Sequence, residues 1–500
     1  MGGVIIGKHT LESLTSGMYS DPYVVFREYI QNSADAIDAA VSGGILPAGG
    51  GLIHITLAPG EGRLSFSDNG TGIPASQAES TLISIGNSKK SARTDRGFRG
   101  IGRLAALSCC SRLTFETSYP GEPVRTRLAI SGAELAARLS SGTAEDAAAA
   151  DVLQRIYTVE TSPERAEAHY FRVELEGVDQ AAGLFRLEDV TDYIAQTAPV
   201  PYDPAFTWGR EIEARLQKAG CPVRHFQVRL TFGPKTYSIY KPYRDTFLAD
   251  RGKNLTDRIS DIDLITLTGA DGSPSAVGWV AQTGYLGRIP DKSIRGLRLR
   301  KGNILIGDGQ TLNAVFKDPR FNGWSMGEFF VVDPLLIPNA RRDNFERNQA
   351  FLLLLEQLRG VAAGITKQLR VASLRRNAQL SAALEQTEQA AKATAAALES
   401  GLTSGQKGPL ARQLTDARQL VGQAPIRSGA DASCQEIAFE ELDLLLGTLR
   451  GATSYKAINA LNHLSHTEKR TLERVFNAIF STGSESANTM VDAILAAFAP

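Results

Sequence analysis

The sequence predicts an α+β protein: an N-terminal α/β sandwich, a second α/β domain and a helical C-terminal region. Three observations predict it. A helix, a hairpin and a glycine-rich loop follow one another near the N-terminus, and strand-like runs alternate with turns from residue 226 to 332. Residues 351–400 are largely Leu, Ala, Gln and Arg, which is typical of long helices. We therefore expect domains at 1–195, 196–347 and 348–500.

The composition is that of a globular chain with balanced charge. Of 500 residues, 43% are hydrophobic and 22% charged, and 54 Lys and Arg match 54 Asp and Glu. This balance does not indicate DNA as a partner, although it does not exclude it. Four scattered cysteines form no disulfide framework, and no run of about eighteen apolar residues occurs. We expect a cytoplasmic protein that does not enter a membrane.

The first element is a helix expected at 22–41, which begins after Asp21 and ends before two glycines. It is apolar nearly all round, so it should be buried. Glu28, Asn32 and Asp35 stand at i, i+4 and i+7 and therefore form one polar stripe. Buried carboxylates need a partner, and oxygen ligands favour a hard cation such as Mg²⁺. The competing interpretation, a solvated helix face, is disfavoured by the apolar flanking positions.

Two glycine-containing segments follow the hairpin of strands expected at 52–57 and 63–67. The second strand ends near Asp68, and the glycines after it allow the backbone to turn tightly beside a pocket. Residues 97–102 then precede an apolar helix expected at 101–110, where bare amides and the positive helix end suit a phosphate. Each pattern alone is common, but their order within one segment is specific.

These motifs together resemble the GHKL superfamily, which comprises gyrase, heat shock protein 90, histidine kinase and MutL ATPases with the Bergerat fold. Glu28-Tyr-Ile-Gln-Asn32-Ser-Ala-Asp35-Ala36 is similar to its E-x-x-x-N-x-x-D-A motif, and Asp68-Asn-Gly70-Thr-Gly72 to its D-x-G-x-G motif. Residues 97–102 resemble its glycine-rich lid segment. The resemblance covers roughly residues 10–180, and residues 11–28 look like the entry to the heat shock protein 90 domain.

A second resemblance lies far downstream. Leu336-Ile-Pro-Asn339-Ala-Arg341-Arg342-Asp343 is similar to the heat shock protein 90 middle-domain loop that delivers an arginine to the γ-phosphate. Adjacent residues in an extended loop point in opposite directions, so we expect only one of the two arginines to reach the γ-phosphate. By the spacing from Asn339 we expect this residue to be Arg342. The alternative is Arg341. The last 150 residues resemble no family that we can name.

The resemblance implies ATP and Mg²⁺ as ligands. It implies that Glu28 is the general base, that Asn32 binds Mg²⁺, that Asp68 reads the adenine amine, and that Arg342 stabilises the transferring phosphoryl group. The other nucleotide-binding positions it implies are Asp35, Gly70, Gly72, Asn87, Lys89, Lys90, Gly97, Gly100 and Gly102. Many relatives carry a threonine in a late strand near an adenine-contacting water, but residues 169–175 contain none.

The function expected from this resemblance is an ATP-hydrolysing, homodimeric conformational clamp similar to heat shock protein 90. One alternative is a MORC- or MutL-like clamp that acts on DNA in genome maintenance or defence. Another is a nucleotide-gated scaffold with little turnover. No Walker A P-loop occurs, so the expectation of nucleotide binding depends on the three motifs. The sequence does not identify a client protein or another macromolecular partner.

Overall fold

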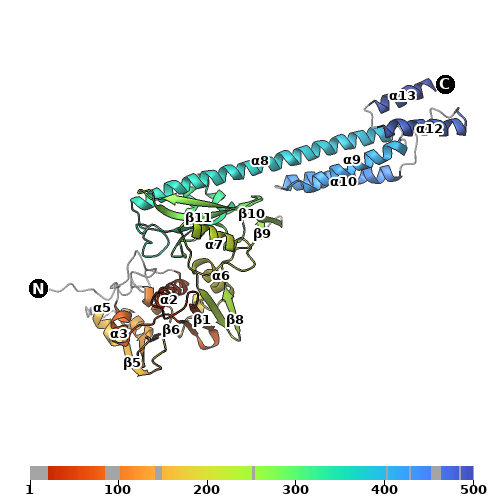
Figure 1. Cartoon of the computed structure of the whole chain (residues 1–500). Coiled ribbons are helices and arrows are strands. Elements are labelled where there is room, and N and C mark those ends of the chain that lie inside the picture. The colour runs from red at the N-terminus through yellow and green to blue at the C-terminus, as the bar shows by residue number, and fades with distance from the viewer. Residues whose placement is uncertain are drawn as a thin grey trace. The chain divides into compact units, whose positions relative to one another are not determined.

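The computed structural model of the chain describes residues 21–84, 102–140, 149–250, 254–400, 402, 404–426, 429–451, 463–482 and 486–498. The chain divides into two compact units, Met1–Thr366 and Lys367–Pro500, and the boundary lies within helix α8 (Gln349–Ser400). Figure 1 shows the order of the elements. Sheets occupy the first unit and helices the second, which confirms the expected α+β class with a helical C-terminal region.

The first unit begins with a sheet in which eight described strands follow the order β5-β4-β3-β6-β2-β1-β7-β8. The strands are β1 (Leu52–Ala58), β2 (Arg63–Asp68), β3 (Arg112–Ser118), β4 (Val124–Ser131), β5 (Tyr157–Pro163), β6 (Tyr170–Glu176), β7 (Gln227–Phe232) and β8 (Lys235–Ile239). Strands β1 and β7 run parallel, with Leu52 opposite Gln227. Because of this pairing, the sheet continues past the domain division expected at 195/196, which stays a prediction.

Helices accompany this sheet. They are α2 (Val24–Ser42), α3 (Ala75–Ile83), α4 (Gly132–Ser140), α5 (Ala149–Ile156) and α6 (Leu187–Thr197), with 3₁₀ turns η2 (Pro59–Glu61), η3 (Gly102–Ser108) and η4 (Gln180–Ala182). Helix α2 confirms the helix expected at 22–41. The helix expected at 101–110 is instead the 3₁₀ segment η3. The alanine-rich residues 133–154 also predict a helix, and the described residues of that range lie in α4 and α5.

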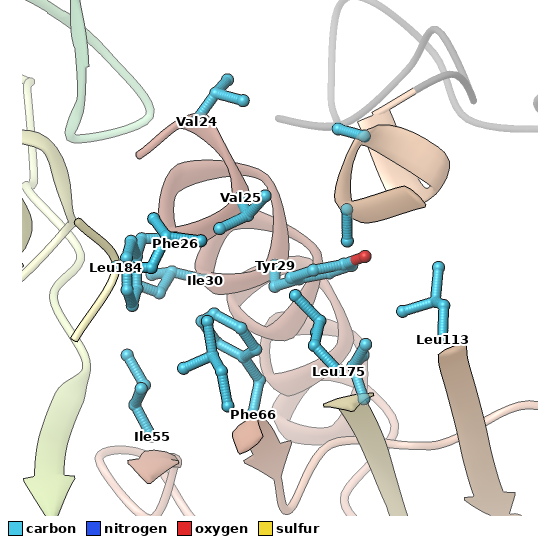
Figure 2. Close-up of a cluster of buried hydrophobic side chains, with 14 of the residues drawn as sticks. Val24, Val25, Phe26, Tyr29, Ile30, Ile55, Phe66, Leu113, Leu175 and Leu184 are labelled. Carbon is cyan, nitrogen blue, oxygen red and sulfur yellow. The ribbon is translucent and has the colours of Figure 1, made fainter. Parts of the chain in front are cut away.

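Aromatic side chains join α2 to the sheet. Phe66 of β2 lies 5.0 Å from Tyr29 and 5.6 Å from Phe26, measured between ring centroids. Figure 2 shows these rings between the helix and the strands. Ile30 and Ile37 are also buried on this helix. Since the core residues and the Glu28 stripe stand on opposite sides of the helix, the packing fixes the direction of the stripe.

The second sheet of the first unit has six described strands in the order β13-β12-β14-β11-β10-β9. They are β9 (Thr246–Asp250), β10 (Leu255–Thr268), β11 (Pro274–Thr283), β12 (Gly296–Lys301), β13 (Ile304–Ile306) and β14 (Met326–Val331). Helix α7 (Gly209–Lys218) packs on β10 and β11, and the turns η5 (Thr311–Val315) and η6 (Pro319–Trp324) lie near β12. The sequence did not predict β9, β10 or α7.

A fully buried carboxylate organises the interior of this second sheet. Glu328 of β14 accepts hydrogen bonds from Lys241 Nζ at 2.7 Å and from Tyr202 Oη at 2.8 Å, and it pairs with Arg300 Nε. Burial alone would raise the pKa of Glu328, but Arg300 and Lys241 outweigh it and hold that pKa at about 2. Its stabilising effect should be complete above the ordinary glutamate pKa and be lost as the pH falls towards 2.

Glu328→Ala should destabilise the first unit by about 3–5 kcal/mol, because two buried cations would lose their counter-ion. Chemical denaturation monitored by circular dichroism measures this. Glu160 is exposed on β5, so Glu160→Ala is the matched control and should stay within about 0.5 kcal/mol of wild type. Equal unfolding midpoints for the two variants would show that the cluster does not support the fold.

The described residues of the second unit form helices and the short non-helical segments beside them. It contains the C-terminal part of α8 and the helices α9 (Ser404–Gln423), α10 (Gly429–Gly451), α12 (His466–Ser481) and α13 (Ala487–Ala497). From the sequence we expect a looser structure at 401–435. This expectation is wrong, since α9 is helical even at Pro409. Leu414 and Ala417 of α9 pack with Leu442 and Leu446 of α10. This tertiary packing outweighs the poor helix propensity of the segment.

Candidate functional site

The polar stripe of α2 is buried, as the sequence predicts. Glu28 is 7% exposed and Asp35 9% exposed, while Asn32 is half-buried. The stripe stands on the side of the helix that is turned away from Phe26 and Ile30. Carboxylate and carboxamide oxygens therefore collect in a place with little water, where charge interactions are strong.

Glu28 lies where three segments meet. Its Oε1 is 3.5 Å from Arg342 Nε and 3.6 Å from Arg27 Nε. A Cβ atom added to Gly102, the first residue of η3, would be 2.0 Å from Glu28 Oε2. A side chain at residue 102 would therefore displace this carboxylate. The structure brings together the residues expected to be the base, the arginine and the last glycine of the lid segment.

Tyr29 ties η3 to α2 beside this carboxylate. Its hydroxyl donates to the carbonyl oxygen of Arg103 at 2.8 Å. Burial raises the pKa of Tyr29 well above its ordinary value, so the hydroxyl keeps its proton and remains a donor. The hydrogen bond holds the start of η3 in register with the helix, and thus holds Gly102 against Glu28.

Asp68 ends β2 and is 5% exposed. Its Oδ1 accepts from the amide of Gly70 at 2.9 Å, which closes a tight turn. Gly72 has φ +66°, and a Cβ atom there would lie 2.0 Å from the carbonyl oxygen of Ser118. A Cβ atom on Gly70 would lie 2.6 Å from that of Ala36 on α2. Both glycines are therefore required by close backbone contacts.

Thr117 on β3 holds the segment after this turn, and the sequence analysis missed it. Its Oγ1 accepts from the amide of Ile73 at 2.8 Å and donates to the carbonyl oxygen of Tyr170 at 3.2 Å. Phe171 pairs with Thr117 on one side and with Asp68 on the other, so all three share one row of the sheet. A threonine hydroxyl thus reaches the turn from β3 rather than from residues 169–175. Leu113, Phe115 and Thr117 alternate along β3, and this alternation could have placed Thr117 on the inner face of the sheet.

The arginine segment forms a small hydrogen-bonded loop, residues 338–345. The amide of Asn339 donates to the carbonyl oxygen of Asn344 at 2.9 Å, and the amide of Arg342 to that of Asn339 at 3.1 Å. Arg342 has φ +57°, an uncommon conformation for a residue with a side chain. The amide of Gly307 donates to the Arg342 carbonyl oxygen at 2.8 Å and helps to hold it. Such strain is frequent at functional sites.

Arg341 takes part through its backbone. Arg27 Nη2 donates to the Arg341 carbonyl oxygen at 3.0 Å, whereas the Arg342 side chain approaches Glu28. Arg341 is exposed and Arg342 is buried, so the two adjacent side chains point differently. Of the other expected residues, Asn87, Lys89, Lys90, Gly97 and Gly100 lie outside the described residues.

Residues 19–153 match the family model described as histidine kinase-, DNA gyrase B- and HSP90-like ATPase. The match supports a GHKL-type ATPase domain in this segment. It includes Glu28, Asn32, Asp35 and Asp68, but it ends before the loop of Arg342. No curated protein matches the chain significantly.

The oxygen donors of the α2 stripe fit Mg²⁺. Mg²⁺ usually takes one or two protein oxygens together with oxygens of phosphate and water, and Asn32 and Glu28 supply such oxygens. In the part of the chain that the structure describes, no cluster of three or more His, Cys, Asp or Glu side chains is arranged to hold a metal. None of the described helices has the length and hydropathy to cross a membrane.

Proposed function

We propose that the first unit binds ATP with Mg²⁺ and hydrolyses it to ADP and phosphate. The observation that carries this proposal is the position of Glu28, which lies between Gly102 and the Arg342 side chain. The family match over residues 19–153 supports an ATPase of the GHKL type. A buried carboxylate beside a glycine backbone and an arginine supplies a proton acceptor and a cation, and phosphoryl transfer to water can use both.

In this mechanism, Glu28 accepts a proton from the attacking water. Arg342 stabilises the negative charge that develops on the transferring phosphoryl group, and Asp68 accepts a hydrogen bond from the exocyclic amine of adenine. The turn through Gly70 and Gly72 lets the main chain border the base. Bound Mg²⁺ would neutralise phosphate charge, and Asn32 would hold it.

We propose further that hydrolysis drives a conformational clamp similar to heat shock protein 90, in a homodimer with domains near 1–195, 196–347 and 348–500. The contact of Arg342 with Glu28 supports this, because it joins a loop after the second sheet to a helix on the first. The balanced charge of the chain favours a protein client over DNA. Duplex DNA that stimulates hydrolysis when an unfolded protein does not would instead support a DNA clamp.

Arg342→Ala should lower the ATP turnover number about 100-fold while the affinity for ATP stays within a few-fold, because an arginine that arrives from another segment acts mainly on the transition state. Steady-state phosphate release gives the rate, and calorimetric titration gives the affinity. The melting temperature measured beside them separates lost chemistry from unfolding.

Arg341→Ala is the matched control for this variant. It retains the carbonyl group that accepts from Arg27, so its turnover should remain near that of wild type. A greater loss of turnover in Arg341→Ala than in Arg342→Ala would reverse the assignment of the two arginines.

A further inference from the structure

Gln31 of α2 is a polar residue whose side-chain amide is buried without hydrogen bonds in the part of the chain that the structure describes. The residue is 0% exposed, and neither its Oε1 nor its Nε2 has a hydrogen-bond partner among the described residues. A buried amide without partners destabilises the state in which it occurs, and an apolar side chain of the same shape would be better there. A glutamine at this position therefore indicates a second arrangement in which the amide is bonded.

The face of α2 that carries Gln31 is a junction with later segments of the first unit. Arg27, Gln31 and Asp38 follow at i, i+4 and i+11, so they share this face. At one end, Arg27 Nη2 donates to the Arg341 carbonyl oxygen at 3.0 Å. At the other end, Arg224 Nη1 donates to Asp38 Oδ1 at 2.9 Å. Gln31 lies between these two contacts.

Asn339 carries the complementary group in the arginine loop. Its Nδ2 donates to Asp343 Oδ1 at 2.6 Å, and since a carboxylate oxygen can only accept, this contact identifies the amide nitrogen. The remaining atom, Asn339 Oδ1, is inaccessible to water and has no hydrogen-bond partner among the described residues. The same loop contacts this face of α2 through Arg341, two residues beyond Asn339, so the unsatisfied donor and the unsatisfied acceptor lie on two segments that touch each other.

We propose that Gln31 is a positioning residue, whose Nε2 donates to Asn339 Oδ1 when nucleotide is bound and thereby seats Arg342 for hydrolysis. This inference rests on the proposed function. The Arg342 guanidinium lies against Glu28, and a γ-phosphate would compete for it. The amide of Arg342 is bonded to the Asn339 carbonyl oxygen, so a shift of the arginine moves Asn339 with it.

Gln31→Met tests the proposal, because methionine keeps the length of the side chain and removes both polar atoms. We expect the turnover number to fall about 10-fold, with the affinity for ATP and the KM within two-fold of wild type. The melting temperature without nucleotide should be equal or higher, since two unsatisfied atoms are gone. A residue with only a structural role predicts the reverse, a lower melting temperature with unchanged turnover.

A double-mutant cycle with Asn339→Ala identifies the partner. If the two side chains act through one bond, Gln31→Met combined with Asn339→Ala should be no slower than the slower single variant. Thr117→Val, which removes a hydroxyl bonded to Ile73 and Tyr170 and not to the arginine loop, is the matched control, and its effect on turnover should multiply with that of Gln31→Met. If the effects of Gln31→Met and Asn339→Ala on turnover multiply in the double variant, the proposed hydrogen bond between the two side chains is wrong.

The same assays separate this inference from the proposed function. Wild-type hydrolysis that Gln31→Met leaves unchanged overturns the role of Gln31 and leaves the ATPase standing. Absence of hydrolysis by the wild-type chain overturns both.

Discussion

Replacing Glu28 by alanine should reduce ATP turnover by a factor of about 100 or more while the chain still binds ATP. The carboxylate at this position is the one expected to take the proton of the attacking water. Its burial beside Gly102 leaves little room for a water molecule to take over that role. Phosphate release under saturating Mg²⁺ and ATP measures the rate, and calorimetric titration measures the binding.

The surroundings of Glu28 call for a second variant. Removing the carboxylate leaves Arg27 and Arg342 without this neighbour, so alanine could also disturb the arginine loop. Glu28→Gln keeps the shape and an acceptor oxygen but accepts a proton far less readily, and it should lose turnover to a similar extent. Wild-type turnover in Glu28→Gln would remove Glu28 from the role of base.

Asp68→Asn should abolish detectable ATP binding. One oxygen of Asp68 already accepts from the amide of Gly70 at 2.9 Å. An asparagine that keeps this bond presents its NH₂ group in place of the second oxygen, and that group opposes the donor amine of adenine. A nucleotide analogue that lacks the exocyclic amine tests whether Asp68 acts through that amine. A site that forms a hydrogen bond with one group of its ligand rejects ligands that lack the group.

Calorimetry with ATP and with the purine analogue that lacks the exocyclic amine measures this preference. The wild-type chain should bind ATP much more tightly than this analogue, and Asp68→Asn should bind ATP no more tightly than the analogue. Thr117→Val is a useful comparison because it leaves the carboxylate in place and removes only the hydroxyl bonded to Ile73 and Tyr170. Equal ATP affinity of Asp68→Asn and wild type would contradict the role of Asp68.

The sequence predicted the parts of the fold that have strong local signals. Helix α2 begins beside Asp21-Pro22 and ends at Gly43, and β1 and β2 alternate about a tight turn, so both could be placed from local chemistry. Strand β10 could not be predicted, because Asp and Arg residues interrupt its apolar alternation. Its antiparallel pairing with β11 stabilises it. Helix α9 could not be predicted either, because its stability comes from packing on α10 and not from its local sequence.

The candidate site was predicted in its residues but not in its contacts. The motif spacing placed Glu28 and Asp68, because each motif is local. The approach of Arg342 to Glu28, the fit of Gly102 and the burial of Gln31 depend on how distant segments pack, and nothing in the local sequence encodes them. Gln31 directly precedes Asn32, yet a glutamine beside a polar stripe is ordinarily solvated.

The nucleotide that remains on the chain after mixing with Mg²⁺ and ATP tests the central claim most directly. The chain is separated from free nucleotide, and the bound nucleotide is identified by chromatography. We predict ADP on the wild-type chain, intact ATP on Glu28→Gln and no nucleotide on Asp68→Asn. ADP on Glu28→Gln in the same amount and at the same rate as on wild type, or no nucleotide on any of the three, would contradict the account.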